Sequence, residues 1–207
     1  MDAVVLVHGL WVHGAVMALM QRRIARSGYR VLNYSYPTLR LTLTQNAQRL
    51  ARYSRDISAP RLHFVGHSLG GLIVLRMLEL NGGTPPGRVV LAGMPFTGSH
   101  AAHRFCRLPG GRAALGRSMT EWLAAGRCAP VGGREIGVIA GSLPLGLGCM
   151  VAPDLPRPSD GVVSVAETDV PGMRDRIVLH VSHSGMLVSR AVVRQICAFL
   201  RDGEFLH

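Results

Sequence analysis

Residues Leu62–Gly71 read LHFVGHSLGG and join two kinds of local structure at a single serine. The opening LHFV is a short apolar run typical of a buried strand, and the apolar residues after it favour a helix. Between the two, Gly66, Ser68 and Gly70 form a G-x-S-x-G pattern, whose glycines let a strand and a helix nearly touch. A serine on so tight a turn is pushed out of the backbone, so its hydroxyl can attack a carbonyl carbon. The stretch therefore predicts a nucleophile at Ser68; the alternative is a serine that only caps the helix.

A second apolar run, Ala3–Val7, predicts another buried strand, and it ends in the sequence His8-Gly9-Leu10. The His-Gly pair allows the backbone to curl, so that the N–H of Leu10 faces the same point as the N–H of Leu69. Two such donors, one of them at the positive end of a helix dipole, form an oxyanion hole. His8 itself is expected to bond a nearby backbone group rather than to act in catalysis.

A catalytic serine also requires a general base. The histidines that follow Ser68 in the chain are His100, His103, His180, His183 and His207. The apolar run at 176–181 predicts a strand that contains His180, whereas His183 lies in the loop beyond it. Active sites of parallel sheets lie in such loops. We therefore favour His183 as the base, keep His180 as the alternative, and expect His100 and His103 at the surface.

The base in turn needs an orienting carboxylate, and two aspartates follow the predicted strand at 137–141. Asp160 opens the sequence DGVVSV, where a glycine frees the turn and an apolar run anchors it. Asp154 lies in the proline-rich stretch 152–158, which is typical of a surface loop. Asp160 is favoured, although a turn or helix-cap aspartate is a common use of Asp-Gly.

Four motifs now stand in order along the chain: Val7–Leu10, Gly66–Gly71, Ser159–Val163 and Ser182–Leu187. Together they resemble the α/β-hydrolase superfamily, and within it the small bacterial lipases and esterases that lack a large lid. The resemblance spans nearly the whole chain, with serine, acid and histidine in the order of that fold.

The resemblance implies a serine hydrolase that cleaves carboxylic esters through an acyl-enzyme, without a metal or a cofactor. It implies Ser68 as nucleophile, Asp160 and His183 as its triad partners, and Leu10 and Leu69 as oxyanion donors. His67, beside the nucleophile, is expected either to support the site from behind or to face solvent. One departure concerns the acid, because eighteen residues, 142–159, separate the end of the strand from Asp160.

The 207 residues are 48% hydrophobic, enough to bury one core, so we expect a single domain over 1–207. Strand and helix patterns alternate along the chain, which predicts an α/β fold: a minimal, mostly parallel sheet of about six strands flanked by helices. Helices are expected near 15–27, 42–55 and 69–80 and at the C-terminal end. Residues 143–150 hold too many glycines and a proline to predict a helix.

Residues 97–134 form a long connection at the place where this fold commonly carries a lid. Apolar residues and arginines interleave there, with a turn sequence at 108–112. The segment is either a helix-turn-helix packed on the sheet or a small cap that contacts an acyl chain while its arginines meet an anionic partner.

The formal net charge is +11, and arginine supplies all of the positive charge because the chain has no lysine. Such a balance permits binding to nucleic acid, anionic lipid surfaces or acidic carrier proteins. Because the arginines are scattered and no recognition motif accompanies them, we expect no nucleic-acid partner. No signal peptide or membrane-spanning run is visible, and the four cysteines lack metal-ligand spacing, so a cytoplasmic protein is expected.

Three functions remain open from the sequence. The first is hydrolysis of a small-molecule or lipid ester. The second uses the same triad on thioesters of coenzyme A or an acyl carrier protein, as a thioesterase or acyltransferase; the arginines between Arg104 and Arg134 motivate it. The third is a binding protein on an inactive hydrolase scaffold, against which the complete set of predicted site residues argues.

Overall fold

The computed structural model describes residues 1–80, 83–125 and 133–207. Six strands of the described chain form one sheet in the order β2-β1-β3-β4-β5-β6, and every neighbouring pair is parallel. The strands are β1 (Ala3–Val7), β2 (Arg30–Tyr34), β3 (Leu62–His67), β4 (Val89–Ala92), β5 (Ile136–Gly141) and β6 (Asp175–Leu179). The predicted α/β fold, with a mostly parallel sheet of about six strands flanked by helices, is confirmed.

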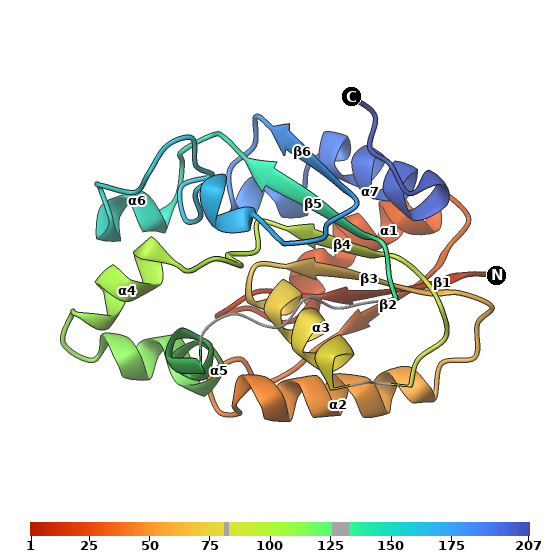
Figure 1. The fold of residues 1–207 in the computed structure, drawn as a ribbon, viewed down its shortest axis with the longest axis horizontal. Helices are drawn as coiled ribbons and strands as arrows, with labels where there is room; N and C mark the ends of the chain where they lie inside the picture. The colour runs from red at the N-terminus through yellow and green to blue at the C-terminus, as the bar shows by residue number, and fades with distance from the viewer. Residues whose placement is uncertain (81–82, 126–132) are drawn as a thin grey trace.

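The inner strands are buried along their whole length, as expected of a parallel sheet covered on both faces. Along β1, Val5 and Val7 enter one hydrophobic cluster with α2 and α3, while Val4 and Leu6 enter a second cluster with α1 and α7. Figure 1 shows these two helix pairs on opposite faces of the sheet. The main helices are α1 (Ala18–Ala25), α2 (Leu43–Arg55), α3 (Leu69–Glu79), α4 (His100–Cys106), α5 (Gly111–Ala125), α6 (Leu147–Val151) and α7 (Arg190–Asp202).

Two helix predictions need correction. The helix expected at 15–27 begins as a short 3-10 turn, Gly14–Met17, and continues as α1 only to Ala25. The stretch 143–150, expected to lack a helix, contains the start of α6. Gly148 lies inside that short helix, and this position requires glycine because a Cβ there would overlap the carbonyl oxygen of Gly161. The glycine therefore serves close packing against the turn that follows Asp160, rather than breaking the helix.

The connection at 97–134 contains α4 and α5, joined by a turn in which Gly110 has a φ of 72°. α5 is interrupted at Gly116, whose φ of 73° lies outside the helical region and whose missing Cβ leaves room for Leu39. Residues 126–132 of this connection lie outside the described residues. Figure 1 shows that α4, α5 and α6 gather beyond the carboxyl ends of the strands. This edge of the sheet is where parallel α/β folds place their sites.

Candidate active site

Ser68 lies at the turn between β3 and α3, with φ 53° and ψ −126°. A positive φ is strained for a residue with a side chain, and it persists only where the surroundings enforce it. Glycines enforce it here. A Cβ on Gly66 would lie 2.5 Å from the Cα of Gly71, and a Cβ on Gly70 would overlap the carbonyl oxygen of Val7. The strand, the helix and the end of β1 therefore meet backbone to backbone, as the sequence predicted.

The hydroxyl of Ser68 is not used for structure. The residue occupies the N-cap position of α3, but its side chain makes no capping hydrogen bond. The backbone of Ser68 holds the turn in place: its N–H donates to the carbonyl of Ala92 at 3.0 Å, and its carbonyl accepts from the N–H of Gly71 at 2.9 Å. Within the described chain, no side chain is hydrogen-bonded to this half-buried hydroxyl, so it remains free for chemistry.

Asp160 and His183 form a buried pair. The Nδ1 of His183 lies 2.7 Å from the Oδ2 of Asp160, and the backbone N–H of His183 donates to the Asp160 carbonyl at 2.9 Å. Only 1% of Asp160 and 8% of His183 is exposed. Because a carboxylate only accepts hydrogen bonds, Nδ1 carries the proton and Nε2 of the neutral ring is left as an acceptor.

The two oxygens of Asp160 have different tasks. Its Oδ1 accepts from the N–H groups of Val162 at 2.9 Å and Val163 at 2.7 Å, which closes the turn. Gly161, with a φ of 93°, packs directly against Leu145. The turn role and the pairing role that the sequence offered as alternatives are thus both present, one on each oxygen.

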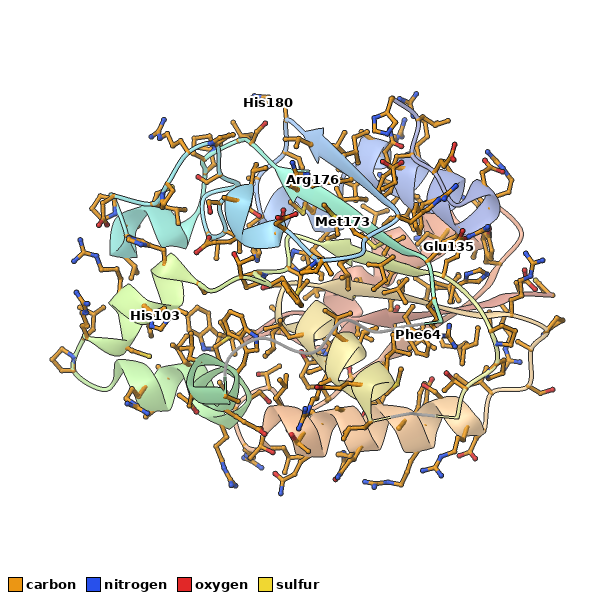
Figure 2. The ribbon with its side chains drawn as sticks, viewed as in Figure 1. Phe64, His103, Glu135, Met173, Arg176 and His180 are labelled. Carbon is orange, nitrogen blue, oxygen red and sulfur yellow. The ribbon has the colours of Figure 1, made fainter. Side chains whose placement is uncertain are left out.

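The competing candidates lie elsewhere. Asp154 is exposed and pairs with Arg104 at 2.8 Å and His100 at 3.2 Å, and the hydrogen bond from Arg104 lowers its pKa to about 2. His180 is exposed, and Figure 2 shows it at the outer margin of the molecule beyond β6. His103 is also exposed and lies on α4 (Figure 2).

Gly93, directly after β4, links the pair to the serine. A Cβ on Gly93 would lie 3.1 Å from both the Oδ2 of Asp160 and the Nδ1 of His183. Ser68 is hydrogen-bonded to the preceding residue, Ala92. The structure therefore brings the three predicted triad residues to one edge of the sheet. Gly93 was not among the predicted site residues; its place at the end of an apolar run is the signal that could have identified it.

The loop after β1 lies beside the serine, because a Cβ on Gly9 would lie 3.2 Å from the Cβ of Ser68. Neither Leu10 nor Leu69 has a partner for its backbone N–H among the described residues. His8 is fully buried, with its Nδ1 2.9 Å from the Gly9 carbonyl and its ring stacked on Tyr36. This is the structural role expected of His8.

A model of the alpha/beta hydrolase family matches residues 4–204. The chain belongs to this family. Among curated proteins, none matches the sequence.

Solved structures of similar fold include the mature form of a lipase from Bacillus licheniformis, with a TM-score of 0.77 and 18% identity over 96% of this chain and 90% of that one. A metagenomic carboxyl esterase matches with a TM-score of 0.66 and 19% identity; the alignment covers 88% of this hydrolase and 64% of the esterase. A pyrethroid hydrolase from Sphingobium faniae matches with a TM-score of 0.61 and 14% identity over 98% of each chain. At these identities the likeness concerns the fold.

Trp11 connects the loop after β1 to the helices of the hydrolase's long connection. Its backbone has a φ of 62°, and its side chain is 50% exposed. Its Nε1–H donates to the carbonyl of Ala114 on α5 at 2.7 Å, and its ring lies 5.6 Å from that of Phe105 on α4. Trp11, which directly follows Leu10, therefore contacts both α4 and α5.

His67 is buried against His183. Its Nε2–H donates to the carbonyl of His183 at 3.0 Å, and the two rings lie 4.7 Å apart. Burial lowers the pKa of His67 to about 3, so the ring is neutral at physiological pH. The alternative that His67 faces solvent is therefore wrong.

The buried neutral state of His67 predicts a pH dependence of stability. Its pKa lies below the value of 6.5 for an unfolded chain, so the unfolded state binds the proton more tightly. This contribution to stability is present above pH 6.5 and is lost as the pH falls toward the folded pKa. Between pH 7 and pH 5 the loss from this one residue is about 2 kcal/mol.

The measurement is urea unfolding of the wild-type protein and of His67→Gln at both pH values. The variant should show a drop in unfolding free energy that is smaller by about that amount. Identical drops in the two proteins would contradict the neutral, buried state of His67.

The arginines of the long connection are partly committed to structure. Arg104 pairs with Asp154, as described above. Arg134 donates to the carbonyl of Leu62 at 2.7 Å and to Thr84 at 2.8 Å, and its guanidinium lies over the ring of Phe64. These two groups hold loops in place and leave fewer charges for an acidic partner than the sequence suggested.

Over the described ranges, His, Cys, Asp and Glu side chains form no group of three that could hold a metal ion. In the same part of the chain, no helix is long and apolar enough to cross a bilayer.

Proposed function

We propose that this chain is a serine hydrolase that cleaves carboxylic esters through an acyl-enzyme on Ser68. The observation that carries the proposal is the buried 2.7 Å contact between His183 and Asp160, at the edge where Ser68 presents an unused hydroxyl. A nucleophile, a base and an orienting acid in one place form the constellation that acyl transfer requires.

In the proposed reaction, the Nε2 of His183 takes the proton of Ser68 as its oxygen attacks the ester carbonyl. The proton then passes to the leaving alcohol, and His183 activates a water molecule that releases the acid. Asp160 holds the ring in the required tautomer and stabilises its cation. The N–H groups of Leu10 and Leu69, both without a protein partner, are proposed to bind the oxyanion; each is worth about 3 kcal/mol in the transition state.

We also propose that the connection 97–134 caps this site within a single-domain enzyme of residues 1–207, and that its apolar side chains contact the acyl group of a small-molecule or lipid ester. The support is the contact of α4 and α5 with Trp11, which directly follows the proposed oxyanion donor Leu10 in the loop after β1. The apolar residues Leu115, Met119 and Trp122 of α5 are packed in the core, which leaves Phe105 and Leu123 partly buried beside them.

The test is turnover of p-nitrophenyl esters of increasing acyl length beside an acyl thioester of coenzyme A. The proposal expects ester hydrolysis and labelling of Ser68 by a fluorophosphonate. Preferential turnover of the thioester would support the thioesterase or acyltransferase instead. Absence of both labelling and turnover would indicate a binding protein on a hydrolase scaffold.

The identity of the acid gives a separate prediction. Asp160→Asn should lower kcat by about 10³- to 10⁴-fold, because the amide no longer fixes the His183 tautomer. The matched variant Asp154→Asn, at an exposed carboxylate that pairs with Arg104, should keep kcat within about 3-fold. Kinetics with a soluble ester measure both. If only Asp154→Asn is impaired, Asp160 is not the acid.

A further inference from the structure

A groove of about 630 Å³ runs between α1 and α7, on the face of the sheet opposite α2 and α3. It does not include any residue of the proposed triad. Both helices begin at the edge where the strands end, since α1 follows the loop after β1 and α7 follows the loop that carries His183. The groove therefore extends along one side of the molecule, away from that edge. Six arginines line it: Arg22, Arg23, Arg26, Arg190, Arg194 and Arg201.

The positive charge of the groove is largely uncompensated. No carboxylate lines it. In the described chain, four of its guanidinium groups have neither an ion pair nor a side-chain hydrogen bond: Arg22, Arg26, Arg190 and Arg194. Of the other two, Arg23 donates to the backbone carbonyl of Val188, and Arg201 pairs with the exposed Asp202.

Some arginines elsewhere on the described surface pair with carboxylates: Arg76 with Glu79, Arg88 with Glu135, Arg104 with Asp154, and Arg174 with Glu204. The α1–α7 groove thus gathers like charges that the fold itself does not neutralise. Spacing reinforces this, since Arg22 and Arg26, like Arg190 and Arg194, are four residues apart and share a helix face.

The groove also has apolar walls. Val193 and Ala198 are buried in it, while Leu19 and Leu206 are 38% and 46% exposed. No Phe, Tyr or Trp is among its lining residues, although surfaces that bind single-stranded nucleic acid stack bases on such rings. Guanidinium groups beside exposed leucines instead match a phosphate joined to glycerol and acyl chains.

We propose that the α1–α7 groove binds the head groups of anionic phospholipids and holds the protein on a bilayer surface. The arginines meet lipid phosphates, and Leu19 and Leu206 contact the apolar part of the interface. Binding of this kind needs no catalysis, so it can be tested independently of the proposed ester hydrolysis.

The experiment is co-sedimentation of the full chain with vesicles of phosphatidylcholine, with and without about 30% phosphatidylglycerol. The wild-type protein should bind only the anionic vesicles, and less at about 0.5 M salt, where exposed charges are screened. The double variant Arg22→Glu and Arg194→Glu, with one change on each helix, should weaken binding by at least about 30-fold.

The control is Arg52→Glu with Arg55→Glu, two exposed arginines in the last turn of α2 on the other face. It changes the net charge equally and should alter binding by less than about 3-fold, because those side chains lie outside the groove. Circular dichroism and turnover of a soluble ester should be unchanged in both variants.

Equal loss in both variants would show that total charge, rather than the groove, drives binding and would overturn the proposal. The proposal would also be overturned if the wild-type protein did not co-sediment with anionic vesicles. The protein could instead bind inositol hexakisphosphate or a DNA duplex through the groove without binding vesicles. That result would overturn the bilayer proposal and identify the ligand as a soluble polyanion or a nucleic acid.

Discussion

Ser68→Ala is expected to lower the kcat for a soluble aryl ester by about 10⁴- to 10⁶-fold and leave the fold intact. The hydroxyl is the proposed nucleophile, and no side chain in the described structure relies on it. The backbone of residue 68 carries the local hydrogen bonds, and alanine retains both of them. Steady-state kinetics together with thermal unfolding measure the two effects separately.

A serine-to-alanine control is available close to the site. Ser184 is exposed and directly follows His183, so Ser184→Ala should keep kcat within about 2-fold. Full activity of Ser68→Ala would exclude the serine mechanism, whatever the effect of the control.

His183→Ala is expected to cost about as much activity as loss of the serine, because residues that act as one unit fail together. His180→Ala, three residues earlier but exposed at the margin of the sheet, should remain within about 2-fold of wild type. Initial rates with the same soluble ester compare the two.

Because His183 is buried, a loss of folding could mimic a loss of catalysis. His183→Gln fills more of the space and should be equally inactive while unfolding cooperatively. Comparable losses at residues 180 and 183 would show that the wrong histidine had been chosen.

The sheet and the turn at Ser68 were predictable because their signals are local. A buried apolar run specifies an inner strand, and G-x-S-x-G specifies a turn through steric clashes among adjacent residues. The predicted range for β1 agrees with the structure, and β5 begins one residue before its predicted range, since both strands consist of apolar residues and glycine and are bounded by polar residues.

The choice between Asp154 and Asp160 was harder because it depends on a long connection. Its path includes α6 and an ion pair between Asp154 and Arg104, neither of which a local pattern reveals. Burial of His67 was similarly hidden, since its partner, the carbonyl of His183, lies 116 positions away in the chain. The α1–α7 groove had a signal, the four-residue spacing of its arginines, but pairing the two helices required the fold.

The contact between Gly70 and the end of β1 bears on how this hydrolase could be re-engineered. Gly70 lies directly against the main-chain carbonyls of Val7 and His8, so backbone contacts set how closely the helix that begins at Leu69 approaches the end of β1, just before Leu10. Surrounding side chains can therefore be exchanged to admit bulkier or smaller acyl groups while that spacing persists. Specificity and turnover become separately adjustable, so libraries confined to α4 and α5 should yield altered preference with little loss of rate.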